Sequence, residues 1–296
     1  MEYLVARTAG ALVAALPEEA AVAVGKLIGW LSYQIDRRHV RVALKNLRMV
    51  YGHSMGRLAR RALVRRVYDH LGQIFCDLAR MSRVFHGNGW RRRVRLVNFE
   101  RVGDALRGGR PVIFVTAHIG NWDVAGAVIG QMHPPFYSIA RTMDNRLLDS
   151  YMDGLRESVG IRILKKHGSM RKVLEILRGG GRIAVLVDQN APVDNLFVPF
   201  LGREAAVVRS VAALALKTGA AILPGYSWRS ADGFRYVVEV GEPILPRRDA
   251  EREAEMYRLT EAFTRQVENW VRKHPEQWLW GHRRWKTRPP WEGNGS

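Results

Sequence analysis

The stretch "PVIFVTAHIGNWD", residues 111–123, joins a continuous apolar run to a histidine and an aspartate. The run PVIFVTA is rich in β-branched residues and shows no polar alternation, which is typical of a strand covered on both faces. Such strands occur in parallel sheets that carry helices on either side. The stretch therefore predicts an α/β fold in which His118 and Asp123 follow the end of a central strand.

The rest of the chain after residue 90 supports this fold, because short apolar runs alternate with segments of helical period. Strands are expected at 111–117, 136–141, 161–164, 182–189, 220–228 and 234–240, and helices at 121–132, 147–160, 169–181, 207–219 and about 250–273. The turn sequence SADG, before the last strand, predicts one antiparallel hairpin. We expect α/β architecture with a mostly parallel central sheet flanked by helices.

Residues 1 to about 85 have helical periodicity only, and the Gly-containing HGNGW at 86–90 separates them from the α/β pattern. We expect a helical region over 1–88 and an α/β domain over 89–296, forming one compact unit. Two apolar segments, 3–16 and 20–35, contain Arg7 and Lys26, and neither reaches the ~20 apolar residues of a spanning helix. Glu2 in place of a basic leader argues against a signal peptide. These helices either lie on a membrane surface or pack against the protein core.

The chain has 47 Lys and Arg against 28 Asp and Glu, a formal net charge of +19. This excess favours a polyanionic partner, either nucleic acid or an anionic membrane surface. The segment WLWGHRRWKTRPP at 278–290 sets Trp278, Trp280 and Trp285 among cations, a mixture that suits the headgroup layer of a bilayer. Nucleic acid can use the same mixture, but no nucleic-acid-binding motif accompanies it, so we favour the membrane.

Several cofactor and metal chemistries have no support in the sequence. Cys76 is the only cysteine, which excludes a disulfide framework and a thiolate zinc cluster. One histidine and one aspartate are too few ligands for a metal, and the GGGR at 179–182 has no Lys-Ser/Thr of a phosphate loop after it. We expect no metal and no cofactor.

His118 and Asp123 can meet only in a bent turn, because five residues on one regular helix are separated by about 140°. The helix would start near Asn121, and Gly120 suits the turn before it. The Asp123 carboxylate would then accept one imidazole N–H and leave the other nitrogen as a base. No G-x-S-x-G elbow is present, so this base would act on a substrate hydroxyl. The alternative is a core histidine beside a helix-capping aspartate.

Other polar residues end neighbouring strands, where open α/β sheets bind ligands. Asp188 ends the strand at 182–189, and Arg141 ends the strand at 136–141. Arg141, Arg146 and Arg156 could together clamp a phosphate or a phosphopantetheine group, since a guanidinium binds phosphate bidentately. A solvated helix face is the alternative for each arginine.

Taken together, these residues resemble the bacterial lysophospholipid acyltransferase superfamily, in its lipid A biosynthesis (lauroyl/myristoyl) branch, which is related to phosphatidylinositol mannoside acyltransferase. The resemblance covers most of the chain and rests on the ordered segments RVALKNL, HIGNWD (H-x₄-D), ARTMDNRLLDSYMDGLRESVG, VLVDQN, VPFLGREAAV, ALALKTGAAILP and WGHRRWKTRP. It implies a glycerol-3-phosphate acyltransferase-like fold. The chain departs from the branch in its interrupted N-terminal apolar segment and in EAAVVRS at 204–210.

The resemblance also implies a reaction, in which an acyl chain passes from acyl carrier protein or coenzyme A to a lipid hydroxyl, with no nucleic acid as partner. The acceptor would be a glycolipid such as a lipid A precursor, or alternatively a lysophospholipid or phosphatidylinositol mannoside. The enzyme would lie peripherally on the cytoplasmic face of the bacterial inner membrane. By this resemblance His118 is the general base and Asp123 orients it. The resemblance also implies that Arg156 and Asp188 bind substrate, and that Asn121 belongs to the motif and shapes its turn. We add Arg141, Asn121 and Asn145 to Arg156 and Asp188 as predicted substrate-binding residues.

Two other functions remain open: a non-catalytic protein that binds lipid or nucleic acid, and a thioesterase that uses water in place of the acceptor. The oligomeric state is not predicted.

Overall fold

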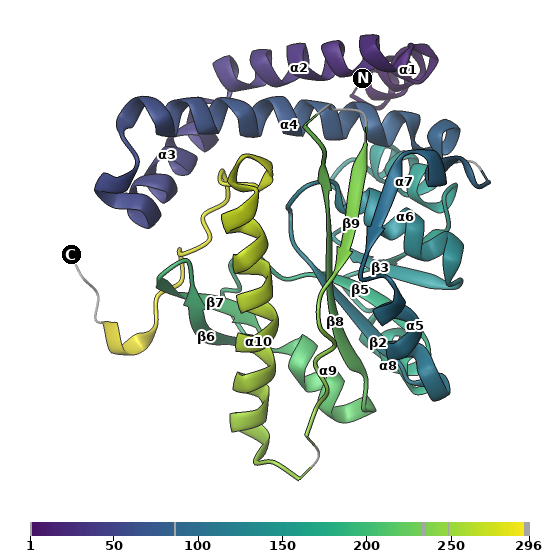
Figure 1. Cartoon of the computed structure of the whole chain (residues 1–296), viewed down its shortest axis with the longest axis vertical. Helices are drawn as coiled ribbons and strands as arrows, with labels where there is room; N and C mark the ends of the chain where they lie inside the picture. Colours follow the sequence, from purple (N-terminus) through teal and green to yellow (C-terminus); the bar gives the residue numbers. More distant parts are fainter. Residues whose placement is uncertain (1, 86, 232–234, 248, 293–296) are drawn as a thin grey trace.

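A computed structural model describes residues 2–85, 87–231, 235–247 and 249–292. Within these ranges seven strands form the central sheet, in the spatial order β1-β9-β8-β2-β5-β3-β4 (Figure 1). The strands are β1 (Val94–Val97), β2 (Val112–Thr116), β3 (Phe136–Ala140), β4 (Ile161–Lys165), β5 (Arg182–Leu186), β8 (Ala221–Arg229) and β9 (Tyr236–Val240).

The sheet is mostly parallel, as the sequence predicts. Strands β8, β2, β5, β3 and β4 run in one direction, whereas β9 is antiparallel to β8 and β1 is parallel to β9. The SADG turn, residues 230–233, includes residues 232 and 233, which lie outside the described residues, but the antiparallel pairing of β8 and β9 is confirmed.

Both faces of the sheet are covered, which explains the unbroken apolar run of β2. Ile113 and Val115 point into one core with α8 (Met170–Arg178), α9 (Ser210–Thr218) and α10 (Arg252–Lys273). Val112 and Phe114 point into the other core with α5 (Glu100–Leu106) and α6 (Trp122–Met132). Alternate side chains of a strand face opposite sides, so a doubly covered strand has to be apolar throughout.

Residues 2–84 are mostly helical, as expected: α1 (Glu2–Ala15), α2 (Glu18–Ile35), α3 (Arg37–Tyr51) and α4 (Arg57–Val84). Figure 1 shows α4 lying across one end of the sheet, with α1 and α2 beyond it. Helix α4 joins the two cores, since Val64 packs in one and Met81 in the other. The remaining helix, α7 (Arg146–Glu157), contacts α1, α4 and β4.

Helices α2 and α4 are in close backbone contact through glycine. A Cβ atom at Gly72 would lie 2.1 Å from the Gly25 oxygen, and one at Gly29 would lie 2.4 Å from the Tyr68 oxygen. The buried face of α2 is therefore made of its small residues, which are Ala21, Gly25 and Gly29. Its large apolar residues point elsewhere.

The structure differs from the sequence prediction in three short segments. Strand β1 and helix α5 were not expected, and neither was the separate hairpin of β6 (Asn195–Phe200) and β7 (Arg203–Val208). The helix expected from 207 begins at Ser210 because β7 continues to Val208. Strand β5 ends at Leu186, so Asp188 lies just beyond it. Short 3₁₀ turns occur at 52–54, 89–92, 107–109, 275–277 and 290–292.

The expectation that the C-terminal tryptophans contact a bilayer is wrong. Trp278, Trp280 and Trp285 are 1%, 0% and 7% exposed and form part of the core with α10. Arg284 is buried with them, and its guanidinium donates to the backbone oxygens of Gln189 and Ala206. The segment is thus an internal strap across the sheet rather than a membrane anchor. No described helix is long and apolar enough to cross a membrane.

Candidate active site

His118 lies in the turn that connects β2 to α6, as the sequence predicts. Asn121 precedes the helix, and its side-chain oxygen accepts a hydrogen bond from the Val124 N–H at 3.3 Å. Gly120 has φ +56°, and a Cβ atom there would lie 1.5 Å from the Ser227 oxygen. Only glycine fits this close contact with Ser227, so the turn after His118 requires glycine at position 120.

The carboxylate on the imidazole belongs to Asp188, not to Asp123. The His118 Nδ1 atom lies 2.8 Å from Oδ1 of Asp188, and the His118 backbone N–H donates to Oδ2 at 2.9 Å. The Trp278 indole N–H donates to the same Oδ2 at 2.8 Å. The prediction that Asp123 accepts an imidazole hydrogen bond is therefore wrong. Residues 187–188 continue alongside β2, since the Val187 N–H donates to the Thr116 oxygen, and this brings Asp188 opposite His118.

Asp123 forms a buried ion pair with Arg156 of α7. The Arg156 Nε atom lies 2.8 Å from Oδ1 and its Nη2 atom 3.3 Å from Oδ2. This two-point contact engages the guanidinium, so Arg156 ties α7 to the start of α6 instead of reaching outward to a phosphate. The predicted clamp of Arg141, Arg146 and Arg156 is not assembled: Arg141 and Arg146 are exposed, while Arg156 is largely buried.

The charges around His118 favour its protonated form. Burial alone lowers the pKa of His118, but the charge of Asp188 and the hydrogen bond to it, together with the charge of Asp123, raise the pKa above its ordinary value of 6.5. Burial acts to raise the pKa of Asp188, yet the charge of His118 and the hydrogen bonds from His118 and Trp278 hold it below its usual range. The imidazole is thus a base of raised proton affinity, oriented by an ionised carboxylate.

The second imidazole nitrogen, Nε2, is available for chemistry. Since Nδ1 hydrogen-bonds to an ionised carboxylate, Nδ1 carries the proton and Nε2 presents its lone pair. The Gln189 Nε2 atom lies 3.5 Å from it. The Trp122 ring packs edge-on against the imidazole, with the ring centroids 5.0 Å apart. This arrangement can take a proton from a hydroxyl placed at Nε2.

Two residues of helix α4 hydrogen-bond to the turn between β2 and α6, and neither was predicted from the sequence. The His70 Nε2 atom lies 3.0 Å from the Gly120 oxygen, and burial lowers the pKa of His70 to about 4, so a neutral imidazole donates this bond. Asp77 accepts a 3.0 Å hydrogen bond from Asn121 Nδ2 and also binds Arg229 and Tyr236. No local pattern marks His70 or Asp77, because each has an ordinary place on a helix.

Two further predicted substrate contacts are helix caps in the structure. Asn121 is 0% exposed, so it has no surface for a substrate, and that assignment is corrected to a capping role. Asn145 caps α7 by accepting from the Leu148 N–H at 3.2 Å, and its Nδ2 atom donates to Glu2 at 3.0 Å. Asp188, also predicted to bind substrate, is buried against His118. Among the described residues no group of three or more His, Cys, Asp or Glu is placed to hold a metal ion.

An apolar cavity begins beside the turn and runs between α6 and the sheet. Its walls include Trp122 and Asp123 near the turn and Gly126 and Ile129 farther along α6. Across from them lie residues of the sheet, which are Phe114, Thr116, Phe136, Ser138, Ile161, Ala184 and Leu186. The cavity measures about 40 Å³, close to the volume of a single water molecule in the liquid, ≈ 30 Å³. It can admit an alkyl chain only if side chains along α6 move apart.

Comparison with known proteins gives the chain a family. A sequence model described as "Bacterial lipid A biosynthesis acyltransferase" matches residues 2–287. The chain is 25% identical to the phosphatidylinositol mannoside acyltransferase of Mycolicibacterium smegmatis, over 74% of this chain and 76% of that protein. It is 25% identical to the lipid A biosynthesis lauroyltransferase of Escherichia coli, over 94% of this chain and 89% of that protein. A myristoyltransferase of the same organism is 22% identical, over 68% of this chain and 61% of its own length.

Proposed function

Because the chain belongs to the bacterial lipid A biosynthesis acyltransferases and is an acyltransferase acting on a glycolipid, we propose that it moves a fatty acyl chain from a thioester to a hydroxyl of that lipid. The observation that carries this proposal is the His118–Asp188 hydrogen bond, which leaves Nε2 as the nitrogen with the lone pair. An apolar cavity lies along the neighbouring helix α6. The donor would be acyl carrier protein or coenzyme A, and the acceptor a lipid A precursor or a phosphatidylinositol mannoside.

The reaction follows from the position of one base and one helix end. His118 Nε2 removes the proton of the acceptor hydroxyl as its oxygen attacks the thioester carbonyl carbon. The carbonyl oxygen becomes an oxyanion. The N–H groups of Val124 and Ala125 already bond to Asn121, so the oxyanion would be stabilised by the N–H groups of Trp122 and Asp123 in the first turn of α6. When the intermediate collapses, the C–S bond breaks, and the imidazolium returns its proton to the leaving sulfur. The products are an ester and a free thiol.

Asp188 and Asp123 have different parts in this mechanism. Asp188 keeps the proton on Nδ1 and stabilises the imidazolium that forms when Nε2 is protonated. Asp123 holds α6 to α7 through Arg156 and adds a weaker electrostatic effect at His118. The aspartate of the H-x₄-D motif is therefore a positioning residue, and the orienting carboxylate comes from the loop after β5.

The apolar cavity along α6 is suited to the acyl chain. A Gly126→Leu variant fills it, because even a Cβ atom at this position would lie 3.0 Å from the Ile161 Cδ1 atom. We expect the variant to shift the preferred donor to a shorter acyl chain, with kcat/KM for the longest accepted chain reduced by roughly tenfold or more, since each buried CH₂ contributes about 0.8 kcal/mol. Competition between thioesters of different length, followed by product mass spectrometry, measures the shift.

Gly154→Leu on α7 is the matched control, because a Cβ at Gly154 meets nothing within 4 Å. An unchanged chain-length profile in a folded Gly126→Leu protein would place the acyl chain elsewhere.

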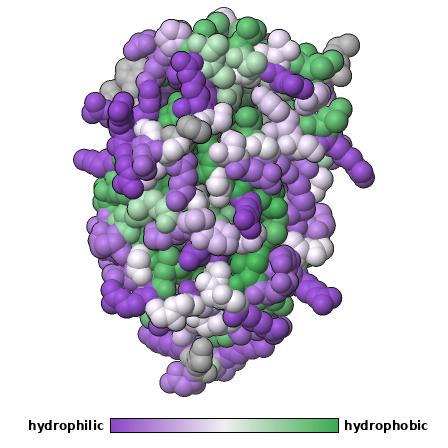
Figure 2. Space-filling model, turned by 90° about the vertical axis from the view of Figure 1, so that its right-hand side faces the viewer, coloured by the Kyte–Doolittle hydropathy of each residue, from purple (hydrophilic) through white to green (hydrophobic). Residues whose placement is uncertain are grey.

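The exposed face of α2 supports attachment to a membrane surface. Small residues occupy its buried face, so Leu27, Leu31 and Ile35 point outward and are 55%, 44% and 79% exposed. Leu4, Val5 and Leu12 of α1 are exposed as well. In Figure 2 hydrophobic residues gather at the upper end of the molecule, where Figure 1 has α1 and α2. An apolar helix face beside cations is typical of a protein that lies peripherally on anionic lipid, here the cytoplasmic face of a bacterial inner membrane.

The double variant Leu27→Gln/Leu31→Gln is expected to bind anionic vesicles at least about tenfold more weakly, since burial of one leucine contributes about 1.5–3 kcal/mol. Flotation with phosphatidylglycerol vesicles measures the binding. Leu245→Gln is the control, because Leu245 is 46% exposed but lies in the segment between β9 and α10, next to Ile244, which pairs with Ile222 of β8. Equal binding by all three proteins would exclude the α2 face from membrane contact.

The acceptor is identified by mass spectrometry of lipids from cells with and without the gene. We expect one glycolipid class to lose the mass of one acyl chain when the gene is absent, which names the acceptor and the chain together. Unchanged glycolipids with an altered phospholipid pool would favour a lysophospholipid acceptor instead.

A further inference from the structure

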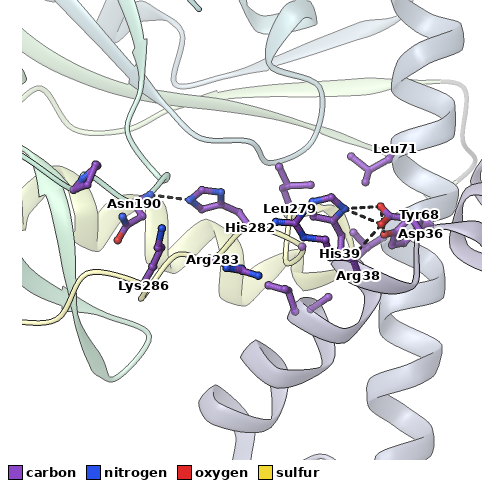
Figure 3. Close-up of a pocket in the computed structure, with 15 residues that line it drawn as sticks. Asp36, Arg38, His39, Tyr68, Leu71, Asn190, Leu279, His282, Arg283 and Lys286 are labelled. Atoms are coloured by element: carbon purple, nitrogen blue, oxygen red, sulfur yellow. Dashed lines mark hydrogen bonds and ion pairs between the residues drawn. The ribbon is translucent and has the colours of Figure 1, made fainter. Parts of the chain in front are cut away.

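A second space, an open groove, has a lining that shares no residue with that of the apolar cavity. Figure 3 shows it between the helical region and the C-terminal strap, with Asp36, His39 and Tyr68 at one end and Asn190 and His282 at the other. Its volume is about 610 Å³, within the usual range of sites for small ligands. One wall comes from α3 and α4 and the other from residues 279–286 of the strap.

The groove adjoins His118 through the backbone of the strap and the loop after β5. The Leu279 N–H donates to the His118 oxygen at 3.0 Å, so this wall of the groove is bonded to the catalytic residue. At the same end the Asn190 N–H donates to His282 Nε2 at 2.9 Å, and Asn190 follows Gln189, the polar neighbour of His118 Nε2. A ligand in the groove would therefore contact residues that are bonded or adjacent in sequence to the catalytic turn.

The two walls are joined by a buried side chain, so the groove has a fixed width. Asn46 of α3 donates through Nδ2 to the backbone oxygens of Trp280 and His282, at 2.9 and 2.8 Å. Asn46 is 6% exposed, and such a bond in a buried site is costly to break. The walls are thus held together before any ligand arrives.

Three cations face the groove without partners. Arg38, Arg283 and Lys286 line it, and within the described ranges the structure gives none of their side chains an ion pair or a hydrogen bond. The one carboxylate in the lining, Asp36, already binds His39 Nδ1 at 2.8 Å and the Tyr68 hydroxyl at 2.9 Å. The groove therefore has an excess of positive charge and unused hydrogen-bond donors.

The same groove has an apolar floor, formed by Val42, Ala43, Val67, Leu71, Pro192 and Leu279. Cations at the rim with aliphatic side chains beneath them match an amphiphile that carries a phosphate. A guanidinium binds phosphate in two-point geometry, and lysine binds it as a point charge.

We propose that this groove binds the phosphate-bearing part of a substrate, with Arg38, Arg283 and Lys286 as the phosphate contacts. The proposal rests on the proposed acyl transfer at His118 and locates one of its substrates. The phosphate has two possible sources, which are the headgroup of the acceptor lipid and the phosphopantetheine part of the acyl donor.

The test measures the binding of two soluble probes by titration calorimetry: coenzyme A for the donor and dihexanoylphosphatidylinositol for the headgroup. In Arg283→Gln/Lys286→Gln we expect the Kd of one probe to increase at least about tenfold, since hydrogen bonds between charged groups are the strong ones. Arg38→Gln, from the opposite wall, should weaken the same probe. Arg41→Gln/Lys45→Gln is the matched control, because both residues are exposed on α3 and do not line the groove.

Weaker coenzyme A binding assigns the groove to the donor, and weaker lipid binding assigns it to the acceptor. The proposal is overturned if the wild-type protein binds neither probe at millimolar concentration, or if the groove variants bind both probes as well as the control does. Binding is also measured in His118→Ala, in which acyl transfer is expected to be slow. The groove proposal can thus fail while acyl transfer is intact, and loss of acyl transfer does not by itself affect the binding result.

Discussion

His118→Ala is expected to lower kcat for acyl transfer by about 10²- to 10⁴-fold, the range that a positioned general base contributes. The acceptor hydroxyl then has no group to take its proton, because Asp188 is buried behind the imidazole. Transfer of radiolabelled acyl chains from a thioester to membrane lipid measures the loss.

The variant also leaves the Asp188 carboxylate with fewer donors, so a lower free energy of unfolding has to be separated from lost chemistry. His118→Gln serves this purpose, since its side-chain amide can donate to Asp188 but cannot act as a base. His53→Ala is the control for loss of an exposed histidine, since His53 lies in the short turn after α3. Transfer that persists in a folded His118→Gln protein would contradict the assignment of His118 as the base.

The parts of the site that the sequence predicted are those encoded by neighbouring residues. The apolar run of β2 predicts a buried strand, and Gly120 and Asn121 predict a turn followed by the start of a helix. These are local signals, because hydrophobic periodicity and capping residues act within one or two turns of chain. The structure confirms them to within a residue. The contact between Asp123 and His118 that was the reason for expecting the bend is absent, because Asp123 binds Arg156.

The partner of His118 could not be predicted, because it depends on which strands are neighbours. Strand β5 lies next to β2 although two other strands separate them in sequence, and the loop after β5 brings Asp188 to the imidazole. Asp123 is closer in sequence and has the right chemistry, so local reasoning selects it. The presence of Arg156 beside Asp123 is a tertiary fact with no local signal.

The C-terminal segment shows the same limit for composition. Tryptophan beside arginine and lysine is common at bilayer surfaces and also in polar-lined cores. Only the fold distinguishes them: Trp278 is buried with its indole N–H on Asp188, whereas Arg283 and Lys286 are exposed in the groove. One short segment thus supplies core tryptophans, the third hydrogen-bond donor to the Asp188 carboxylate and two of the cations that line the groove.

Asp188→Asn is expected to lower kcat by roughly 10²- to 10⁴-fold. This is the range that a general base contributes, and replacing the carboxylate of a Ser-His-Asp triad by an amide has an effect at its upper end. An amide at this position can present N–H to Nδ1, which favours the wrong tautomer and turns the imidazole lone pair away from the substrate. Asn is nearly isosteric with Asp, so the backbone and Trp278 can keep their places.

The pH dependence separates Asp188 from Asp123. A general base works only when it is deprotonated, so kcat/KM rises with pH as His118 loses its proton. In the wild type this rise occurs above pH 6.5, because Asp188 raises the pKa of His118. Without the Asp188 charge, burial dominates and lowers that pKa, so the residual activity of Asp188→Asn should rise at lower pH than in the wild type. In Asp123→Asn the rise should move little, because the charge of Asp123 is the smallest of the effects on His118. If the pH at which kcat/KM rises changed in Asp123→Asn but not in Asp188→Asn, the residue that orients His118 would be Asp123, the aspartate of the H-x₄-D motif.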